Sequence, residues 1–348
     1  MRTVAQCVEA GLVEGSKLHV DASVIDADAA KESVIKGAPE LITLLKRAYR
    51  ATESKLEETS TPGNYQAIND RMMSQSDPDA ALVRKGSGDS RPRYQNHRVV
   101  DDHKGVITAI ETTPGSIAEN KKLMNLLDQH ESNTHCQVQT VVADHKYGTS
   151  ENYVACQARG ITTHMGDALG KARHAQERSI FGDEAFTYDA RRDVYLCPAG
   201  QILKPRRMHP IRRTIEYKAP ARVCAVCVLR AQCTRSHHGR TVQRHEKQAL
   251  LDVARVQANS RAAWRNRRRR QHLIERSFAD AANNHHFKRA RWRRLWRQWL
   301  WRQQIQDYLI AAIQNVRILL AHQNPKPSAA AAVALPASIT RLQPGFAY

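Results

Sequence analysis

Residues 16–29 read SKLHVDASVIDADA, and this short segment indicates how the fold is built. Apolar and polar residues alternate from Leu18 to Asp21, which is the period of a β-strand with one buried face. Asp21 falls at the end of that apolar run, and a carboxylate in this position lies at the sheet edge where α/β proteins bind ligands. A turn or cap role is an equally good interpretation of Asp21, as it is of Asp26 and Asp28.

A second strand that ends in an acid is expected at residues 137–143, QVQTVVA, which Asp144 follows directly. Between the two strands, residues 38–58 and 118–130 have the apolar spacing of amphipathic helices. Two β-rich runs flank the turn DDHKG, in which Gly105 favours a hairpin and Asp101 and Asp102 are expected to be turn residues. This order of strands and helices predicts a mixed sheet with helices on both faces.

Smaller signals concern a loop and two helices. Residues 59–92 are rich in Gly, Ser, Pro and Asp and are expected to form loop and short turns. Ser150 is the expected N-cap of a helix that ends at Gly160. In the helix over residues 38–58, four leucines are expected to form the apolar side: Leu41, Leu44, Leu45 and Leu56.

The composition is strongly basic. The 348 residues include 54 Lys+Arg and 34 Asp+Glu, for a formal net charge of +20. Such a charge points to a polyanionic partner, either nucleic acid or an anionic membrane. No apolar run approaches the ~18–20 residues that a membrane span requires, and the N-terminus has no signal-type apolar segment. Nucleic acid in the cytoplasm is therefore the favoured partner, and no membrane association is expected.

The positive charge is densest in residues 265–299, RNRRRRQHLIERSFADAANNHHFKRARWRRLWRQW. Between Arg261 and Arg302 there are fourteen Lys+Arg and two acids, Glu275 and Asp280. A solvated helix face normally mixes both signs, so an ordinary surface explains this pattern poorly. Glu275 is either one half of a structural ion pair or a functional carboxylate in a cationic field.

Two long helical regions are expected in the C-terminal third. The first begins near residue 248, packs Ile274 and Phe278 toward the core, and is broken by NNHH at residues 283–286. The second has apolar residues at helical spacing that are expected to face the core: Trp292, Leu295, Trp296, Trp299, Leu309, Ile313, Val316 and Leu320. The low-complexity tail is expected to be disordered.

The seven cysteines are an odd number, which favours reduced thiols or metal ligands over a secreted disulfide framework. Cys224, Cys227 and Cys233 form C-x2-C-x5-C, and Cys197 in YLCPAGQ offers a fourth ligand for a tetrahedral zinc ion. Structural zinc is favoured over free or buried thiols, and redox chemistry comes last. The other cysteines are expected to be core thiols: Cys7, Cys136 and Cys156.

Several segments together resemble the DDE transposases of bacterial insertion sequences. They are KLHVDAS, YQNHRVVDDHKGVITAIETT, VVADHKYGTSENY, YLCPAGQ with CAVC, and IERSFADAANNHHFKRARWRR, and they follow the family's order over about residues 16–320. The resemblance implies an α/β, ribonuclease H-like mixed sheet flanked by helices, with an inserted Cys-rich β-containing module and long C-terminal helices. The expected division is 1–160 for the first part of the catalytic core, 161–247 for the inserted module with the candidate zinc ligands, 248–322 for the basic helical part of the core that carries Glu275, and 323–348 for the disordered tail.

The resemblance also implies an activity, namely metal-dependent cleavage and strand transfer of insertion-sequence ends. Asp21, Asp144 and Glu275 would be the three catalytic acids and would hold two Mg²⁺ (or Mn²⁺) ions. The implied partners are the terminal repeats and target DNA, bound by a homodimer in the bacterial cytoplasm at the nucleoid. The side chains expected to bind DNA phosphates are Arg267, Arg268, Arg269, Arg270, His272, Lys288, Arg289, Arg291, Arg293 and Arg294.

The sequence departs from the family's pattern in two places. Twenty residues precede Asp21, too few for a helix-turn-helix, so the family's N-terminal DNA-binding region is expected to be missing. Arg268, Gln271 and Ala282 stand where related groups carry Tyr, Arg and Lys. Two alternatives therefore stay open: a truncated, non-catalytic DNA-binding remnant, and a metal-dependent nuclease without strand transfer.

Overall fold

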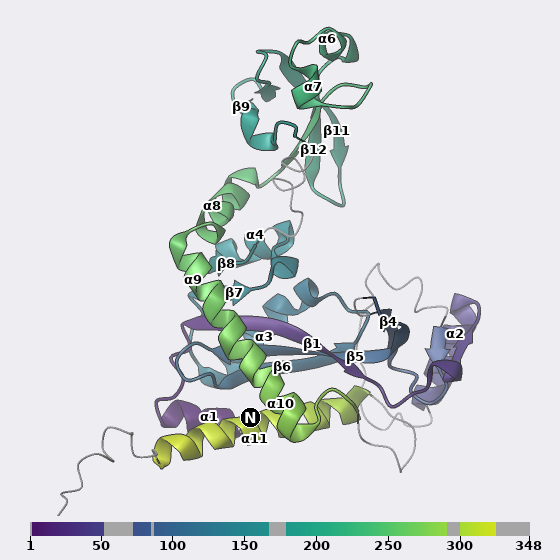
Figure 1. The fold of residues 1–348 in the computed structure, drawn as a ribbon, viewed down its shortest axis with the longest axis vertical. Coiled ribbons are helices and arrows are strands. Elements are labelled where there is room, and N and C mark those ends of the chain that lie inside the picture. The colour runs from purple at the N-terminus through teal and green to yellow at the C-terminus, as the bar shows by residue number, and fades with distance from the viewer. Residues whose placement is uncertain (1, 52–71, 85–86, 167–178, 291–299, 325–348) are drawn as a thin grey trace, which may run out of the picture.

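The structure is a computed structural model that describes the chain except for residues 1, 52–71, 85–86, 167–178, 291–299 and 325–348. In the described residues, helices cover a main mixed sheet, and a smaller second sheet lies beyond one end of it (Figure 1). The α/β class expected from the sequence is confirmed.

The main sheet is built around β1 (Lys17–Asp26). β5 pairs antiparallel with β1 and with its hairpin partner β6, whereas β7 and β8 extend the sheet on the other side of β1 as parallel strands. The expected hairpin is confirmed, and Gly105 occupies its turn at a φ of 76° that glycine adopts without strain. The other strands of this sheet are β4 (Ala81–Arg84), β5 (Ser90–Asp101), β6 (Ile107–Pro114), β7 (Thr140–Ala143) and β8 (Thr162–His164).

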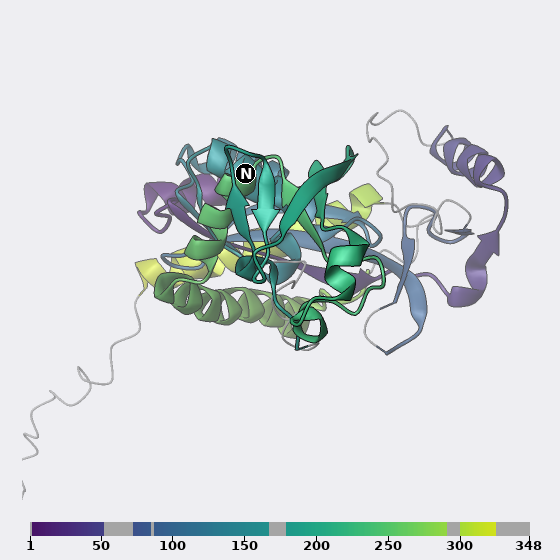
Figure 2. The ribbon, with the colours of Figure 1, turned by 90° about the horizontal axis from the view of Figure 1, so that it is seen from above.

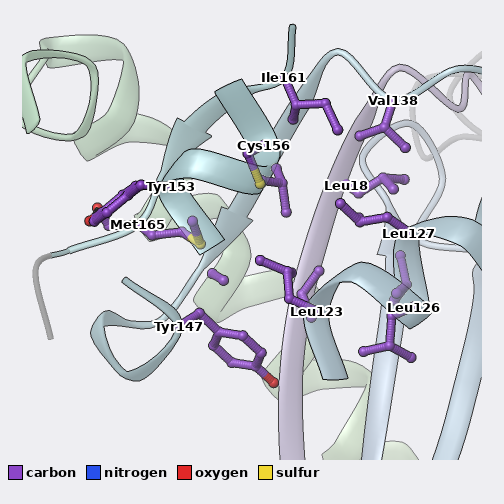
Figure 3. Packing of buried hydrophobic residues seen from close by; sticks show 14 of the residues in the cluster. Leu18, Leu123, Leu126, Leu127, Val138, Tyr147, Tyr153, Cys156, Ile161 and Met165 are labelled. Carbon is purple, nitrogen blue, oxygen red and sulfur yellow. Dashed lines mark hydrogen bonds between the residues drawn. The ribbon is translucent and has the colours of Figure 1, made fainter. Parts of the chain in front are cut away.

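One face of the main sheet packs against α3 (Leu123–Thr134), α4 (Ser150–Ala158) and α8 (Gln248–Ala258). Because successive strand residues point to opposite faces, Leu18 and Val20 of β1 both enter this core. Figure 3 shows Leu18 beside the leucines of α3, with the other labelled side chains of the cluster around them. The predicted alternation therefore matches the structure: Leu18 and Val20 enter this core, and the residues between them point to the opposite face.

The opposite face carries α10 (Arg276–His285) and α11 (Leu300–Gln323). Ile274 and Phe278 are buried there, as the sequence predicts. Arg98 of β5 is fully buried between the sheet and these helices, and its guanidinium lies 4.6 Å from the centre of the Phe278 ring. Its Nη1 donates to Ser277 Oγ at 2.6 Å. A buried cation thus ties the sheet to α10.

The helical region of the C-terminal third consists of α8, α9 (Arg261–Arg270), the π-helical turn η6 (Gln271–Glu275) and α10 in succession. Ser260 caps α9 by accepting a hydrogen bond from Ala263 N–H at 3.1 Å. α10 ends at His285, and His286 has a left-handed φ of 52°. The predicted break at residues 283–286 is confirmed.

The second sheet is antiparallel with the order β13-β12-β11-β10-β9. Its small core contains Phe186, Leu203 and Val242 and the packed rings of Tyr195 and Tyr217, whose centres are 5.1 Å apart. Between β12 and β13 lie two short helices, α6 (Ala221–Ala225) and α7 (Arg230–Cys233). The strands are β9 (Thr187–Asp189), β10 (Val194–Leu196), β11 (Ile202–His209), β12 (Thr214–Lys218) and β13 (Thr241–His245).

The remaining elements are short or peripheral. Figures 1 and 2 both place α2 at one end of the main sheet, away from the body of the molecule. These elements are α1 (Arg2–Glu9), η1 (Lys31–Ser33), β2 (Val34–Lys36), α2 (Pro39–Ala51), β3 (Met72–Ser74), η3 (Glu119–Lys122), η4 (His145–Tyr147) and η5 (Asp183–Ala185).

The orientation of α11 differs from the expectation. Leu309 and Ile313 are 55% and 44% exposed, and Val316 and Leu320 also face outward. The side chains of α11 that pack on the sheet are mostly polar. Polar groups of the sheet and of α10 form hydrogen bonds with them, which compensates for their burial. The buried side is mainly polar and consists of Gln303, Gln306, Asp307, Ile310, Ala311, Gln314 and Asn315.

The first half of the same predicted apolar stripe lies within residues 291–299, outside the described residues. It consists of Trp292, Leu295, Trp296 and Trp299.

Three local predictions also need correction. Leu41 and Leu44 of α2 are exposed and Leu45 is partly buried, whereas Ile42 is buried; Leu56 lies outside the described residues. Residues 59–92 are not all loop, because β3 pairs with β2 and β4 pairs with β5. The cap of α4 is Thr149, whose side chain accepts from Asn152 N–H, so the helix begins at Ser150 itself.

Candidate active site

Asp21 of β1 and Asp144, which directly follows the neighbouring parallel strand β7, occupy adjacent positions. The pairing of β1 with β7 ends at Val20 opposite Ala143, and each aspartate follows directly. Val20 and Ala143 point into the core with α3, so both aspartates leave the sheet on its opposite face. The expectation that Asp21 ends its strand is wrong, because β1 continues to Asp26, but Asp21 does lie where the pairing with β7 stops.

Arg270, the last residue of α9, reaches this pair of acids. Its Nη1 lies 2.6 Å from Asp21 Oδ2, and the two side chains are 11% and 24% exposed. Burial raises the pKa of Asp144, but hydrogen bonds from His145 and the charge of Arg270 outweigh it, so the pKa of Asp144 lies below its usual value. Both carboxylates are thus held in a cationic environment.

Glu275 lies in η6, five residues after Arg270, on the face of the sheet that both aspartates point to. Its side chain is exposed, and it makes no hydrogen bond or ion pair within the described residues. The structure therefore brings Asp21 and Asp144 together and places the helical segment of Glu275 over the same face, without joining its carboxylate to theirs. In the described part of the chain, no three His, Cys, Asp or Glu side chains already lie in an arrangement that could hold a metal ion.

Arginines of α9 make several contacts within the protein. Arg269 donates from Nε to Asp102 Oδ1 at 2.5 Å, and Asp102 also binds the buried ring of His19 at 2.7 Å. Arg267 donates to the carbonyl oxygen of Ala258. Asp102 is therefore more than the turn residue expected from the sequence, because it anchors α9 to the β5–β6 hairpin. The sequence carries no signal for this role, since the partners are remote along the chain.

The other predicted DNA-binding residues occupy different settings. Arg268 is exposed and stacks over Trp264, and His272 is exposed. Lys288 donates to Ser23 Oγ at 2.6 Å, and Arg289 lies 3.4 Å from Asp28 Oδ1. Both therefore lie beside the C-terminal half of β1 and the residues that follow it. Three of the predicted residues lie outside the described chain: Arg291, Arg293 and Arg294.

A groove of about 650 Å³ is lined in part by residues that follow the two aspartates in the sequence. Its lining includes residues 22–24 of β1, which follow Asp21, and Lys146, which follows Asp144 by two positions. Lys146 Nζ lies 3.0 Å from Glu119 Oε1. Burial lowers the pKa of Lys146, but the hydrogen bond to Glu119 and the charges of Glu119, Asp144 and Asp21 raise it above its ordinary value. Sequence reasoning missed Lys146 and Glu119, although the position of Lys146 beside Asp144 was a usable signal.

The four cysteines of the predicted zinc site line one pocket beside the second sheet: Cys197, Cys224, Cys227 and Cys233. All are partly buried and none forms a disulfide. Of the predicted core thiols, Cys7 and Cys156 are buried, whereas Cys136 is only partly buried.

Residues 196–317 match a family model described as a transposase DDE domain. The resemblance to DDE-type transposases is confirmed. The match to the DDE domain covers about a third of the chain and includes Glu275 and all four cysteines of the pocket, while Asp21 and Asp144 precede it. Domains of this transposase family act on DNA and generally use divalent metal ions. A comparison with curated proteins finds no match.

None of the helices in the described chain is both long enough and apolar enough to cross a membrane.

Proposed function

We propose that the chain is the catalytic core of a DNA transposase, which cleaves insertion-sequence ends and joins them to target DNA. The observation that carries the proposal is the adjacent position of Asp21 and Asp144 at the end of the β1–β7 pairing, on the face that α9, η6 and α10 cross. The transposase DDE match in the following part of the chain supports the same activity. In this proposal Asp21, Asp144 and Glu275 are the three catalytic acids.

The donor set fits a hard divalent cation. Mg²⁺ and Mn²⁺ prefer carboxylate oxygens and retain water, and the side chains of Asp21 and Asp144 are partly exposed. The low pKa of Asp144 keeps its carboxylate ionised near neutral pH. When bound, two such ions would polarise the phosphodiester and activate the attacking water or 3′-hydroxyl. Glu275 would complete the set by turning its exposed side chain toward the aspartates.

Arg270 provides the positive charge that balances these acids before they bind a cation. Its guanidinium is nearly buried, and its Nε is buried without a partner within the described residues. A metal ion at Asp21 would compete with Arg270 for the same carboxylate oxygens. The released guanidinium would then be free to bind a phosphate of the substrate.

DNA binding would use the exposed cationic side chains and the groove. Arg268 and His272 are exposed on the helical segment that carries Glu275, and Lys146 lines the groove next to Asp144. Cations so placed bind the phosphate backbone without reading the base sequence. We extend the proposal to a homodimer on paired DNA ends, in the bacterial cytoplasm at the nucleoid.

The proposed fold is ribonuclease H-like. The mixed sheet, with an antiparallel hairpin on one side of β1 and parallel strands on the other, supports it. We propose the division expected from the sequence, a core from residues 1–160 and 248–322 with residues 161–247 as an inserted module, except that β8 (Thr162–His164) stays with the core because it pairs with β7 in the main sheet. The position of the second sheet beyond one end of the main sheet supports this division (Figure 1).

A second candidate is a DNA-binding remnant without catalysis. The separation of Glu275 from the aspartates and the use of Arg270 as the partner of Asp21 favour it. A third candidate, a nuclease without strand transfer, shares the proposed active site and differs only in its products.

The proposal is tested with DNA that carries the sequences flanking the gene on both sides, in Mg²⁺ or Mn²⁺. Wild type is expected to give nicked and joined products, and Asp21→Ala, Asp144→Ala and Glu275→Ala each to abolish both while salt-sensitive DNA binding remains. Asp252→Ala removes an exposed carboxylate of α8 and is the matched control, which should keep activity. An inert wild type that still binds DNA supports the remnant, and nicking without joined products supports the nuclease.

A further inference from the structure

The second sheet places four thiols around one pocket. Cys197 follows β10, Cys224 lies in α6, Cys227 lies between α6 and α7, and Cys233 ends α7. Two separate stretches of chain, the turn after β10 and residues 224–233, therefore supply the sulfur atoms. The rest of the lining contains apolar side chains, Gln201, Thr234, two arginines and no carboxylate within the described residues.

The turn after β10 directs a backbone donor at one of these sulfurs. Gln201 N–H donates to Cys197 Sγ at 3.3 Å, and Cys197 N–H donates to the carbonyl oxygen of Gln201 at 2.9 Å. Gly200 closes the turn with a φ of 72°, a conformation that favours glycine. A hydrogen bond to sulfur stabilises the thiolate relative to the thiol, and the thiolate is the form that binds metal.

The arginines around the pocket can balance the negative charge of a metal tetrathiolate. Four thiolates and one Zn²⁺ carry a net charge of −2, and Arg230 and Arg240 both line the pocket. Arg240 is fixed by a hydrogen bond from Nη1 to the carbonyl oxygen of Cys233 at 3.2 Å and by Asp183 at 3.2 Å. Two guanidinium groups can therefore offset the charge of the occupied site.

A divalent ion binds all four sulfurs as thiolates, so metal binding releases their protons.

We propose that Cys197, Cys224, Cys227 and Cys233 bind one zinc ion that closes the core of the second sheet. Tetrahedral sites with four sulfur ligands suit zinc, which needs no further ligand and no redox partner. In the described residues no three of these thiols already lie at ligand spacing, so binding requires side-chain rotation that draws the sulfurs together within the pocket.

Zinc would have a structural role here. The second sheet has short strands and a core with few large apolar side chains. A core of this size is a weak source of stability, and small units of this kind are commonly stabilised by a metal or by disulfides. None of the four cysteines is among the proposed catalytic acids, so the zinc site does not depend on the proposed activity.

Elemental analysis of the purified full-length chain tests this proposal without DNA. Wild type is expected to contain about one zinc per chain, and Cys224→Ser with Cys227→Ser to contain none. Cys136→Ser is the matched control, because it removes another partly buried free thiol that lies outside the pocket, and it should keep the zinc. Wild type without metal, after expression in zinc-supplemented medium, would overturn the proposal, as would iron in place of zinc.

A second measurement covers the case in which the double variant does not fold. Titration of wild type with a mercurial reagent should release zinc in proportion to four modified thiols, and Co²⁺ exchange should give the intense sulfur-to-cobalt absorption of a tetrathiolate site. A Cys224–Cys227 disulfide found by mass spectrometry under non-reducing conditions, together with absent cobalt absorption, would show a redox pair and refute the zinc site.

Discussion

Replacement of Arg270 by Gln should lower the stability of the metal-free protein and raise its affinity for Mn²⁺. The new side chain can still form hydrogen bonds, but it lacks the charge that contacts Asp21 Oδ2 at 2.6 Å. Charge-assisted hydrogen bonds contribute about 1.5–3 kcal/mol, and both side chains are mostly shielded from water. We expect the free energy of unfolding in EDTA to fall by about 2 kcal/mol.

The same interaction opposes metal binding, because a cation at Asp21 must displace Arg270. If Mn²⁺ at Asp21 has to displace an interaction of about 2 kcal/mol, removal of that interaction should tighten Mn²⁺ binding roughly 10- to 30-fold. The opposite signs of the two effects distinguish this reasoning from a general loss of structure. Urea unfolding in EDTA gives the first quantity, and calorimetric titration with Mn²⁺ gives the second.

Arg269→Gln is the matched control. It removes the neighbouring guanidinium, whose Nε contacts Asp102 Oδ1 at 2.5 Å, and it leaves Asp21 with its partner. This variant should lose stability without a gain in Mn²⁺ affinity. Equal Mn²⁺ affinities of wild type and Arg270→Gln, with folding intact, would refute the competition between arginine and metal.

Two further predictions concern the core. Burial raises the pKa of Asp77 to about 7 against a hydrogen bond from Tyr94, so the folded chain holds an extra proton between about pH 4 and 7. The stability of wild type relative to Asp77→Asn should therefore fall as the pH rises through this window, by about 4 kcal/mol in urea unfolding; a difference that stays constant with pH contradicts this. On α11, Leu309→Lys should change stability by no more than about 0.5 kcal/mol, whereas Ile310→Lys should cost about 3 kcal/mol or more. The reverse order, measured by thermal unfolding, would show that α11 faces the sheet with its other side.

The strands that position the aspartates could be predicted because their signals are local. Alternation around Leu18 and the apolar run before Asp144 each need only a few consecutive residues. The end of β1 could not be predicted in the same way, because its extension to Asp26 depends on pairing with β5, whose residues are far along the chain. The alternation of apolar and polar residues shows that a strand is present, but pairing with other strands determines where the strand ends.

The face of α11 illustrates a different limit. Helical spacing indicates an apolar stripe through Leu309 and Ile313, and the spacing is real, but periodicity does not say which side meets the sheet. The sheet presents Asn96 and Arg98 at this place, so the polar side of the helix packs inward. The ion pair between Arg270 and Asp21 could not be predicted either, because the two residues are 249 positions apart in the sequence.

The π-helical turn η6 sets the rotational register between Arg270 and Glu275. Hydrogen bonds in such a turn span five residues instead of four, so each residue turns through a smaller angle than in an α-helix. In a regular α-helix the same two residues would point in clearly different directions. Deletion of one residue from η6 would leave the glutamate four positions after Arg270, about 40° from it around the axis of a regular α-helix. The π-helical turn thus accommodates one residue more than a regular turn while the helix continues from α9 into α10 and Ile274 stays in the core.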